Sequence, residues 1–221
     1  MHLVFEGPDG VGKSTLIDAV IQRCEKKGVV TGSEERDFDA PYAFVEEPSR
    51  DGVGRVIREV LLRGDYSAET LANCFSADRY VQLQEFTLPY LQSGGSVVQS
   101  RSFLSTLVYQ SVQGKSVDSL LALPGNTFAS MNAPDKVIVP YVHSVDTLID
   151  RLNGLGEEED VFEKAVFQKK VLEVYRSGWF DDLCAQYGVD VIYVDVSCGV
   201  EDAVRRTLRC VHGAGFFAED G

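Results

Sequence analysis

The chain has 221 residues, of which 44% are hydrophobic and 25% charged, and its formal net charge is −13. These values are typical of one well-buried globular domain and exclude fibrous or largely disordered classes. Because an acidic surface repels phosphate backbones and anionic lipid, we expect neither a nucleic-acid partner nor a membrane partner. A small nucleotide remains possible, since it responds to the local field of a cleft.

The cysteines and the apolar runs bear on location. The five cysteines include no C-x-x-C pair, which argues against a zinc site or a disulfide framework. The first residues carry no basic leader, and no apolar stretch approaches the length of a membrane span. We therefore expect a cytoplasmic protein with reduced thiols.

The first elements along the chain are a strand, a helix, a loop and a second strand. His2–Glu6 is a short apolar run that suits a strand buried on both faces of a parallel sheet. From Ser14 apolar residues recur at intervals of three and four, which predicts a helix. Residues 31–40 are polar and aperiodic, so we expect an exposed loop there. Tyr42–Glu46 is predicted to form the next strand.

Two helices and a third strand follow. One helix is predicted over Val53–Leu62 and a longer one from Ser67, whose hydroxyl can cap its first turn. Pro89 is expected to end or kink the longer helix. After a Gly-Gly break, Ser96–Gln99 is predicted to be a strand.

The remaining pattern continues to alternate strands with helices. Strands are predicted at Lys136–Val142 and Val189–Val194, a loose tail at about 213–221, and helices at Val145–Leu152, Val161–Ser177 and Val200–Leu208. This alternation predicts an α/β fold, a doubly wound five-stranded parallel sheet flanked by helices, in a single domain over 1–221. Ligands are expected at the carboxyl ends of the strands.

A phosphate-binding motif lies between the first strand and the first helix. Residues 7–14 fit G-x-x-x-x-G-K-S/T without a gap. Its backbone N–H groups converge on phosphates, Lys13 reaches the β- and γ-phosphates, and Ser14 ligates Mg²⁺. Such a motif would match by chance in about one chain in a hundred of this length. The position between a strand and a helix lowers this frequency further. ATP and Mg²⁺ are the expected cofactors, and the candidate ATP-binding residues are Gly7, Pro8, Asp9, Gly10, Val11, Gly12, Lys13, Ser14 and Thr15.

The sequence around this motif resembles that of one protein family. Phe5 to Thr15 is similar to F-E-G-x-D-G-x-G-K-S-T of the thymidylate kinases, a family of P-loop nucleoside monophosphate kinases. Later blocks keep that family's order: Glu47-Pro48 with Ile57-Arg58, Phe75-Ser76-Ala77-Asp78-Arg79, Arg101 with Ser105 and Tyr109-Gln110, and Pro134-Asp135. The resemblance implies the P-loop NTPase fold, Mg²⁺-dependent transfer of phosphate from ATP to dTMP, and a homodimer.

The resemblance also implies residue roles. Phe75 would stack on thymine, Arg79 would donate to the base O4, Arg58 and Arg101 would grip the acceptor phosphate, and Gln110 would face the base or sugar. The substrate-binding residues expected in this way are Glu47, Pro48, Arg58, Phe75, Arg79, Arg101, Ser105, Tyr109 and Gln110. Asp9 would lie near the transferring phosphate and the metal.

Structural alternatives remain open for several of these residues. Phe75 also suits a core aromatic, and Arg79 suits a surface ion pair with Asp78 or Glu85. The alternative for Arg58 is the solvated face of its helix. Tyr109 and Gln110 have the alternative of a helix surface.

The chain departs from the family pattern at several positions. Ser100 and Ser102 replace an aspartate and an aromatic residue beside Arg101, and Glu46 stands where arginine is common. The expected lid, at about 153–162, is acidic and lacks the arginine that usually neutralises the transferring phosphate; we expect its carboxylates to point to solvent. Our hypothesis is that Arg151 replaces the missing lid arginine, with Arg50 and Arg55 as further candidates. The predicted catalytic residues are Asp9, Lys13, Arg101 and Arg151.

Two rival functions remain open. A deoxynucleoside kinase would phosphorylate a 5′-hydroxyl with Glu47 as general base, whereas a phosphate acceptor needs cations instead. A nucleotide-binding protein with weak catalysis is the second rival, because Ser100 and the acidic lid are unusual for a kinase. The preferred base also remains open among thymine, uracil, cytosine and a purine.

Overall fold

Six parallel strands form one sheet in the computed structural model, which describes residues 1–25, 29–31, 39–61, 66–153 and 158–216. The strands are β1 (His2–Phe5), β2 (Val29–Thr31), β3 (Tyr42–Glu46), β4 (Ser96–Ser100), β5 (Lys136–Tyr141) and β6 (Asp190–Asp195). Their order across the sheet is β2-β3-β4-β1-β5-β6, and every neighbouring pair is parallel. The predicted fold class is thus confirmed.

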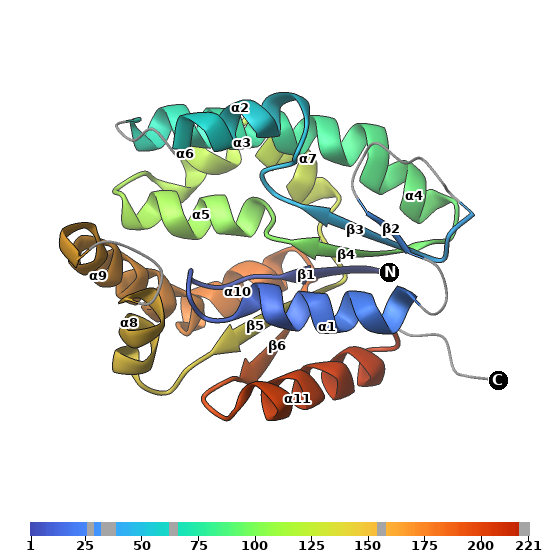
Figure 1. Ribbon diagram of the computed structural model, residues 1–221. Coiled ribbons are helices and arrows are strands. Elements are labelled where there is room, and N and C mark those ends of the chain that lie inside the picture. The colour runs from blue at the N-terminus through green and yellow to red at the C-terminus, as the bar shows by residue number, and fades with distance from the viewer. Residues whose placement is uncertain (26–28, 32–38, 62–65, 154–157, 217–221) are drawn as a thin grey trace.

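Helices connect the strands and cover both faces of the sheet (Figure 1). They are α1 (Lys13–Glu25), α2 (Gly52–Leu61), α3 (Ala68–Gln82), the π-helical η1 (Leu83–Thr87), α4 (Leu88–Gln92), α5 (Phe103–Val112), α6 (Val117–Leu121), α7 (Pro124–Met131), α8 (Val145–Asn153), α9 (Glu158–Tyr175), α10 (Gly178–Gln186) and α11 (Val200–Gly213).

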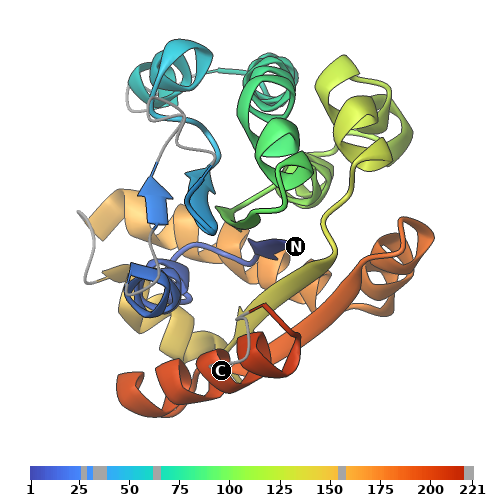
Figure 2. The same cartoon turned by 90° about the vertical axis from the view of Figure 1, so that its right-hand side faces the viewer.

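Alternation along the buried strands gives the sheet two apolar faces. Leu3 and Phe5 of β1 point into a core cluster shared with α1 and α11, whereas Val4 points into a cluster shared with α5, α9 and α10. Figure 2 shows α1 and α11 on one side of the sheet and the helices between β3 and β5 on the other. Because successive side chains of a strand point to opposite faces, continuous apolar runs are what a doubly covered sheet requires.

The predicted count of five strands was one short. Thr31, which we expected in an exposed loop, belongs to β2 and pairs with Phe44 of β3. A three-residue edge strand carries too little hydrophobic pattern to be recognised, and its place is decided by the free edge of β3. The rest of the predicted loop, residues 32–38, lies outside the described residues.

The helix that follows Ser67 confirms the predicted cap, and of the two outcomes predicted for Pro89, an end and a kink, the end does not occur. The Thr70 amide donates to the Ser67 hydroxyl at 3.1 Å, so Ser67 caps α3 as expected. The helix does not end at Pro89. Its pitch widens to a π turn in η1, where the Leu88 amide donates to Leu83, and α4 then continues to Gln92. A π turn moves hydrogen bonds away from the carbonyl that a prolyl ring would strike, so proline is tolerated.

The carboxyl-terminal segment is more ordered than predicted. Helix α11 runs to Gly213, and Phe216 is only 3% exposed because its ring packs on Tyr42 with centroids 5.4 Å apart. The expectation of a loose tail was wrong for 213–216, where burial of one large aromatic ring outweighs the glycine-rich sequence. Residues 217–221 lie outside the described residues.

The strand order places three chain segments side by side. β3, β4 and β1 are neighbours, so the residues that follow them meet at one edge of the sheet. The Glu47 amide donates to the Ser100 carbonyl and the Arg101 amide to the Phe5 carbonyl, both at 2.9 Å. The phosphate motif, Glu47 and Arg101 are therefore held together by the backbone itself.

Candidate active site

The phosphate motif forms a loop between β1 and α1. Gly12 has a φ of 99°, a conformation that side chains rarely adopt, which explains the glycine there. The Lys13 ammonium donates to the Gly7 and Pro8 carbonyls at 2.8 and 2.7 Å. Burial, with help from Arg101, lowers the pKa of Lys13 to about 7. A bound polyphosphate would favour the charged ammonium, because opposite charges stabilise each other in a cleft.

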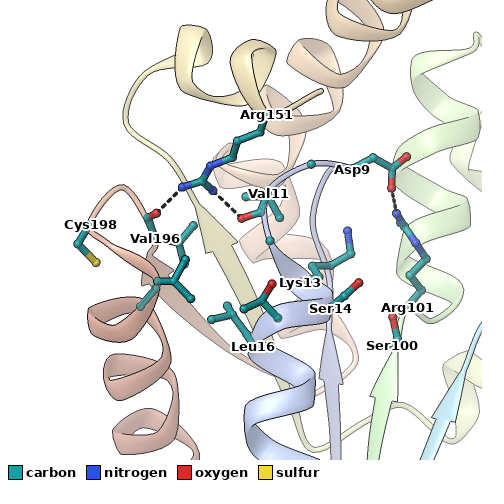
Figure 3. A pocket seen from close by; sticks show the side chains of 15 residues that line it. Asp9, Val11, Lys13, Ser14, Leu16, Ser100, Arg101, Arg151, Val196 and Cys198 are labelled. Carbon is teal, nitrogen blue, oxygen red and sulfur yellow. Dashed lines mark hydrogen bonds and ion pairs between the residues drawn. The ribbon is translucent and has the colours of Figure 1, made fainter. Parts of the chain in front are cut away.

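A cavity of about 540 Å³ surrounds this loop (Figure 3). Its polar part is formed by the loop, Ser100, Arg101 and Arg151, and its far end is formed by Val196, Cys198, Val200 and Ala203. The loop amides and the start of α1 suit phosphates, and the apolar end suits a base. This cavity therefore has the chemistry of a nucleoside triphosphate site.

A second cavity of about 350 Å³ lies on the other side of Arg101. Its walls come from the loop, the residues after β3, and helices α3, α5 and α9, namely Asp9, Glu47, Pro48, Leu71, Phe75, Arg79, Arg101, Ser105, Thr106, Tyr109, Gln110, Gln113, Phe167 and Gln168. Most of the residues predicted to bind the acceptor are thus brought together. Asp9 and Arg101 line both cavities.

Arg101 lies between the two cavities and lines both. It follows β4 with a φ of 67°, a strained conformation for a residue with a side chain. Its guanidinium pairs with Asp9, donates to the Ser105 and Tyr109 hydroxyls at 3.2 and 3.1 Å, and lies 4.9 Å from the centre of the Tyr109 ring. Although burial opposes it, Arg101 and Lys13 hold the pKa of the Asp9 carboxyl below its ordinary value. Asp9 therefore stays ionised beside two cations.

Arg79 is not the surface residue that one alternative suggested. It is 1% exposed, and its donors reach both Glu47 oxygens at 2.5 to 3.1 Å, the Ser102 carbonyl, the Thr106 hydroxyl and the Asn126 side chain. A guanidinium has five N–H groups. The Nε–H is shared between the two Glu47 oxygens, Nη2 serves Glu47, Ser102 and Thr106, and Nη1 donates to Asn126, which leaves one Nη1 N–H for a ligand. Donation to a base oxygen stays a prediction. The main effect of Arg79 here is to tie α3 to α5, α7 and the segment after β3.

Glu47 is held within the same buried group. It is 6% exposed and also accepts from Gln99 at 3.1 Å. Burial raises the pKa of Glu47 to about 7, against the opposing charge of Arg79. With several donors on its two oxygens, Glu47 serves as a wall of the second cavity.

The structure does not bring Arg58 to either cavity. Its donors hold the Pro48 and Ser49 carbonyls at 2.5 and 3.1 Å, and it lies 3.4 Å from a Glu46 oxygen. Arg50, another candidate cation, is 75% exposed and also pairs with Glu46. Glu46, which stands where the family commonly has arginine, therefore contacts both cations away from the two cavities.

Arg151 lies beside the phosphate loop, as the hypothesis about the missing arginine requires. It donates to the Val11 carbonyl and the Val196 carbonyl, both at 3.0 Å, across the mouth of the phosphate cavity (Figure 3). Arg55 lines neither cavity. The acidic run of the predicted lid, including residues 154–157, lies outside the residues whose side chains are described.

Phe75 and Gln110 face the second cavity from α3 and α5. Gln110 is 4% exposed, so the helix-surface alternative for it was wrong. Its Nε2 donates to Gln113 at 3.3 Å, and its buried Oε1 has no partner in the described part of the chain. Phe75 is half-buried rather than sealed in the core. An aromatic face and an unsatisfied acceptor are what a flat, hydrogen-bonding base requires.

Sequence reasoning missed a buried carboxylate under the site. Glu6 is fully buried and accepts from the Ser102 amide and hydroxyl at 2.7 Å, the Ser105 hydroxyl at 2.5 Å and the Tyr175 hydroxyl at 2.7 Å. Ser102 also caps α5 through the Leu104 amide. No spacing in the sequence could have joined these residues, because they come from β1, α5 and α9.

Comparison with known proteins identifies the family. The sequence model described as thymidylate kinase matches residues 5–182. A probable thymidylate kinase of Methanococcus vannielii is 33% identical over 79% of this chain and 75% of that protein. One of Thermococcus onnurineus is 32% identical over 79% and 82%, and the thymidylate kinase of Desulfotalea psychrophila is 30% identical over 79% and 80%. The match covers the phosphate loop and every residue that lines the second cavity, whereas Val196, Cys198, Val200 and Ala203 of the phosphate cavity lie beyond it. The chain belongs to the thymidylate kinase family.

Proposed function

We propose that the protein phosphorylates dTMP to dTDP with ATP as donor. One observation carries this proposal: the phosphate cavity and the acceptor cavity share Asp9 and Arg101, so two anions would meet there. The names of the relatives support the same activity.

The roles of the loop and Arg101 follow from the geometry. Lys13 and the loop amides would hold the β- and γ-phosphates, and Arg101 would bind the acceptor phosphate. An acceptor oxygen then forms a bond to the γ-phosphorus while the bond to the β-phosphate oxygen breaks, releasing ADP. The protein contributes position and positive charge rather than covalent chemistry.

Mg²⁺ fits the loop through Ser14. The Ser14 side chain is exposed at the start of α1 and lines the phosphate cavity. Asp9 fits a direct metal ligand less well, because Arg101 and Gln168 already occupy its two oxygens. In the described part of the chain, no group of three His, Cys, Asp or Glu residues could hold a metal. Mg²⁺ would therefore arrive with ATP and supply charge neutralisation.

The acceptor base would lie between Phe75 and α5. Phe75 would stack on it, and the unpartnered Gln110 acceptor suits an N–H group of the base edge. Pro48 and Tyr109 would complete the walls. These features suit thymine and uracil alike, and the names of the relatives favour thymine; the further alternatives are cytosine and a purine.

One assay tests the function. ATP is supplied with dTMP, dUMP, dCMP, dGMP or thymidine, and the products are separated. We expect dTDP to form fastest. Phosphorylation of thymidine but not of dTMP would establish the deoxynucleoside kinase. The hydrogen bonds that the Glu47 carboxylate accepts argue against this rival, because they compete with its action as a general base. ATP binding without any product would leave only a nucleotide-binding protein.

We also propose that the chain acts as one kinase domain, as a homodimer, in the cytoplasm. Val56 of α2 and Val81 of α3 are 54% and 51% exposed on two helices that contact each other, and a second copy could cover them. None of the five cysteines, all of which lie among the described residues, forms a disulfide, which suits a reducing compartment. No helix among the described residues is long and apolar enough to span a membrane. Light scattering of the purified protein tests the dimer.

A further inference from the structure

A glutamine on α9 holds the phosphate loop at the point where the two cavities meet. The Asp9 amide donates to Gln168 Oε1 at 2.8 Å, and Gln168 Nε2 donates to Asp9 Oδ2 at 2.9 Å. Gln168 is 6% exposed. One buried side chain therefore binds both the backbone and the carboxylate of the same loop residue.

This clamp limits how Asp9 can engage Arg101. A carboxylate and a guanidinium tend to form two parallel hydrogen bonds. Here Gln168 occupies Oδ2, so Arg101 Nη2 pairs with Oδ1 alone. Arg101 Nη1 donates to Ser105, and among the described residues no acceptor contacts Arg101 Nε. The guanidinium thus keeps donors for a further anion.

The Asp9 side chain needs such a restraint. It is 53% exposed on a loop, between Arg101 and Lys13. An unrestrained carboxylate could rotate to bind Arg101 through both oxygens, or turn toward Lys13. Either position would set a negative charge against the incoming phosphates and occupy their cationic ligands.

We propose that Gln168 is a positioning residue for phosphoryl transfer, which pins Asp9 so that Arg101 remains available to the acceptor phosphate. The inference rests on the proposed function and extends it to a residue of the acceptor cavity wall that acts through Asp9.

Steady-state kinetics of three variants test this proposal. Gln168→Leu removes both contacts, and Gln168→Glu keeps an acceptor for the Asp9 amide but not the donor to Oδ2. Both variants lose the contact to Asp9 Oδ2, and this loss should raise KM for dTMP roughly tenfold in each, with KM for ATP within about twofold. Lys169→Leu, at the exposed neighbouring position, is the matched control and should behave as wild type. A wild-type KM for dTMP in Gln168→Glu would overturn the proposal.

A double-mutant cycle separates positioning from a structural effect. If Gln168 acts through the Asp9 carboxylate, then Gln168→Leu should have only a small further effect on kcat/KM in an Asp9→Ala background, where the contact to the amide of residue 9 survives. Additive losses would show that Gln168 acts elsewhere and refute the clamp. Thermal unfolding of each variant confirms that the comparison concerns folded protein.

A readout without turnover keeps the two proposals distinguishable. Amide hydrogen exchange at Asp9 should be slower in wild type than in Gln168→Leu, because Gln168 accepts from that amide. Equal exchange would reject the clamp. If wild type phosphorylates no monophosphate, the proposed function fails, and exchange at Asp9 alone decides whether Gln168 holds the loop.

Discussion

Replacing Arg79 by methionine should mainly destabilise the protein rather than weaken base recognition. The Arg79 and Glu47 side chains are 1% and 4% exposed, and Arg79 supplies three of the hydrogen bonds to the Glu47 carboxylate. Among the described residues, the variant leaves this carboxylate with Gln99 as its remaining donor. At pH 8, where Glu47 is ionised because its pKa is about 7, removing one partner of this buried ion pair should cost about 3–5 kcal/mol. For a chain of this size, we expect Tm to fall by roughly 10 °C.

Urea unfolding followed by circular dichroism measures this change. Replacing both partners, as in Arg79→Met with Glu47→Leu, should recover part of the loss, because no unpaired buried charge remains. An Arg79→Met variant that loses less than about 1 kcal/mol but shows a large rise in KM for dTMP would refute the structural role. That result would establish the family's donation to the base instead.

Three further predictions concern other contacts of the site. The pKa of Glu47 is about 7 in the folded state, against 4.5 in the unfolded chain. Its proton therefore stabilises the native state below pH 4.5, and this contribution of roughly 3 kcal/mol is lost as pH rises through 7. The urea midpoints at pH 5 and pH 8 should differ more for wild type than for Glu47→Gln, and an equal difference in the two proteins would contradict this. Arg151→Ala should lower kcat about a thousandfold with a smaller rise in KM, whereas the exposed Arg205→Ala should leave kcat unchanged. Unchanged turnover in Arg151→Ala would remove Arg151 from the mechanism. Gly125→Ala would place a methyl group 1.8 Å from the Ser76 carbonyl and should cost about 1–3 kcal/mol in urea unfolding; a neutral effect would mean that α7 can shift away from α3.

Local patterns in the sequence predicted the layered fold and half of the site. The phosphate loop is contiguous, so its glycines, Lys13 and Ser14 can be recognised without knowing the fold. Buried parallel strands are continuous apolar runs, and helices show periodicity, so both leave a signal within a few residues. Family motifs added the residues that line the second cavity, including Phe75 and Gln110.

Contacts between distant segments decided what the sequence could not reveal. Three arginines have different structural environments because the fold brings a different carboxylate to each. Arg79 pairs with Glu47 in the core, Arg58 lies near Glu46 on the surface, and Arg101 pairs with Asp9 between the two cavities. Gln168 and Asp9 are 159 positions apart and carry no shared pattern. A hydrogen bond depends on positions in space within a few tenths of an ångström, and only the packing of α9 against the loop sets them. The residues predicted to bind phosphate could therefore be recognised from the sequence itself, whereas the residues that hold them in place were decided only by the tertiary structure.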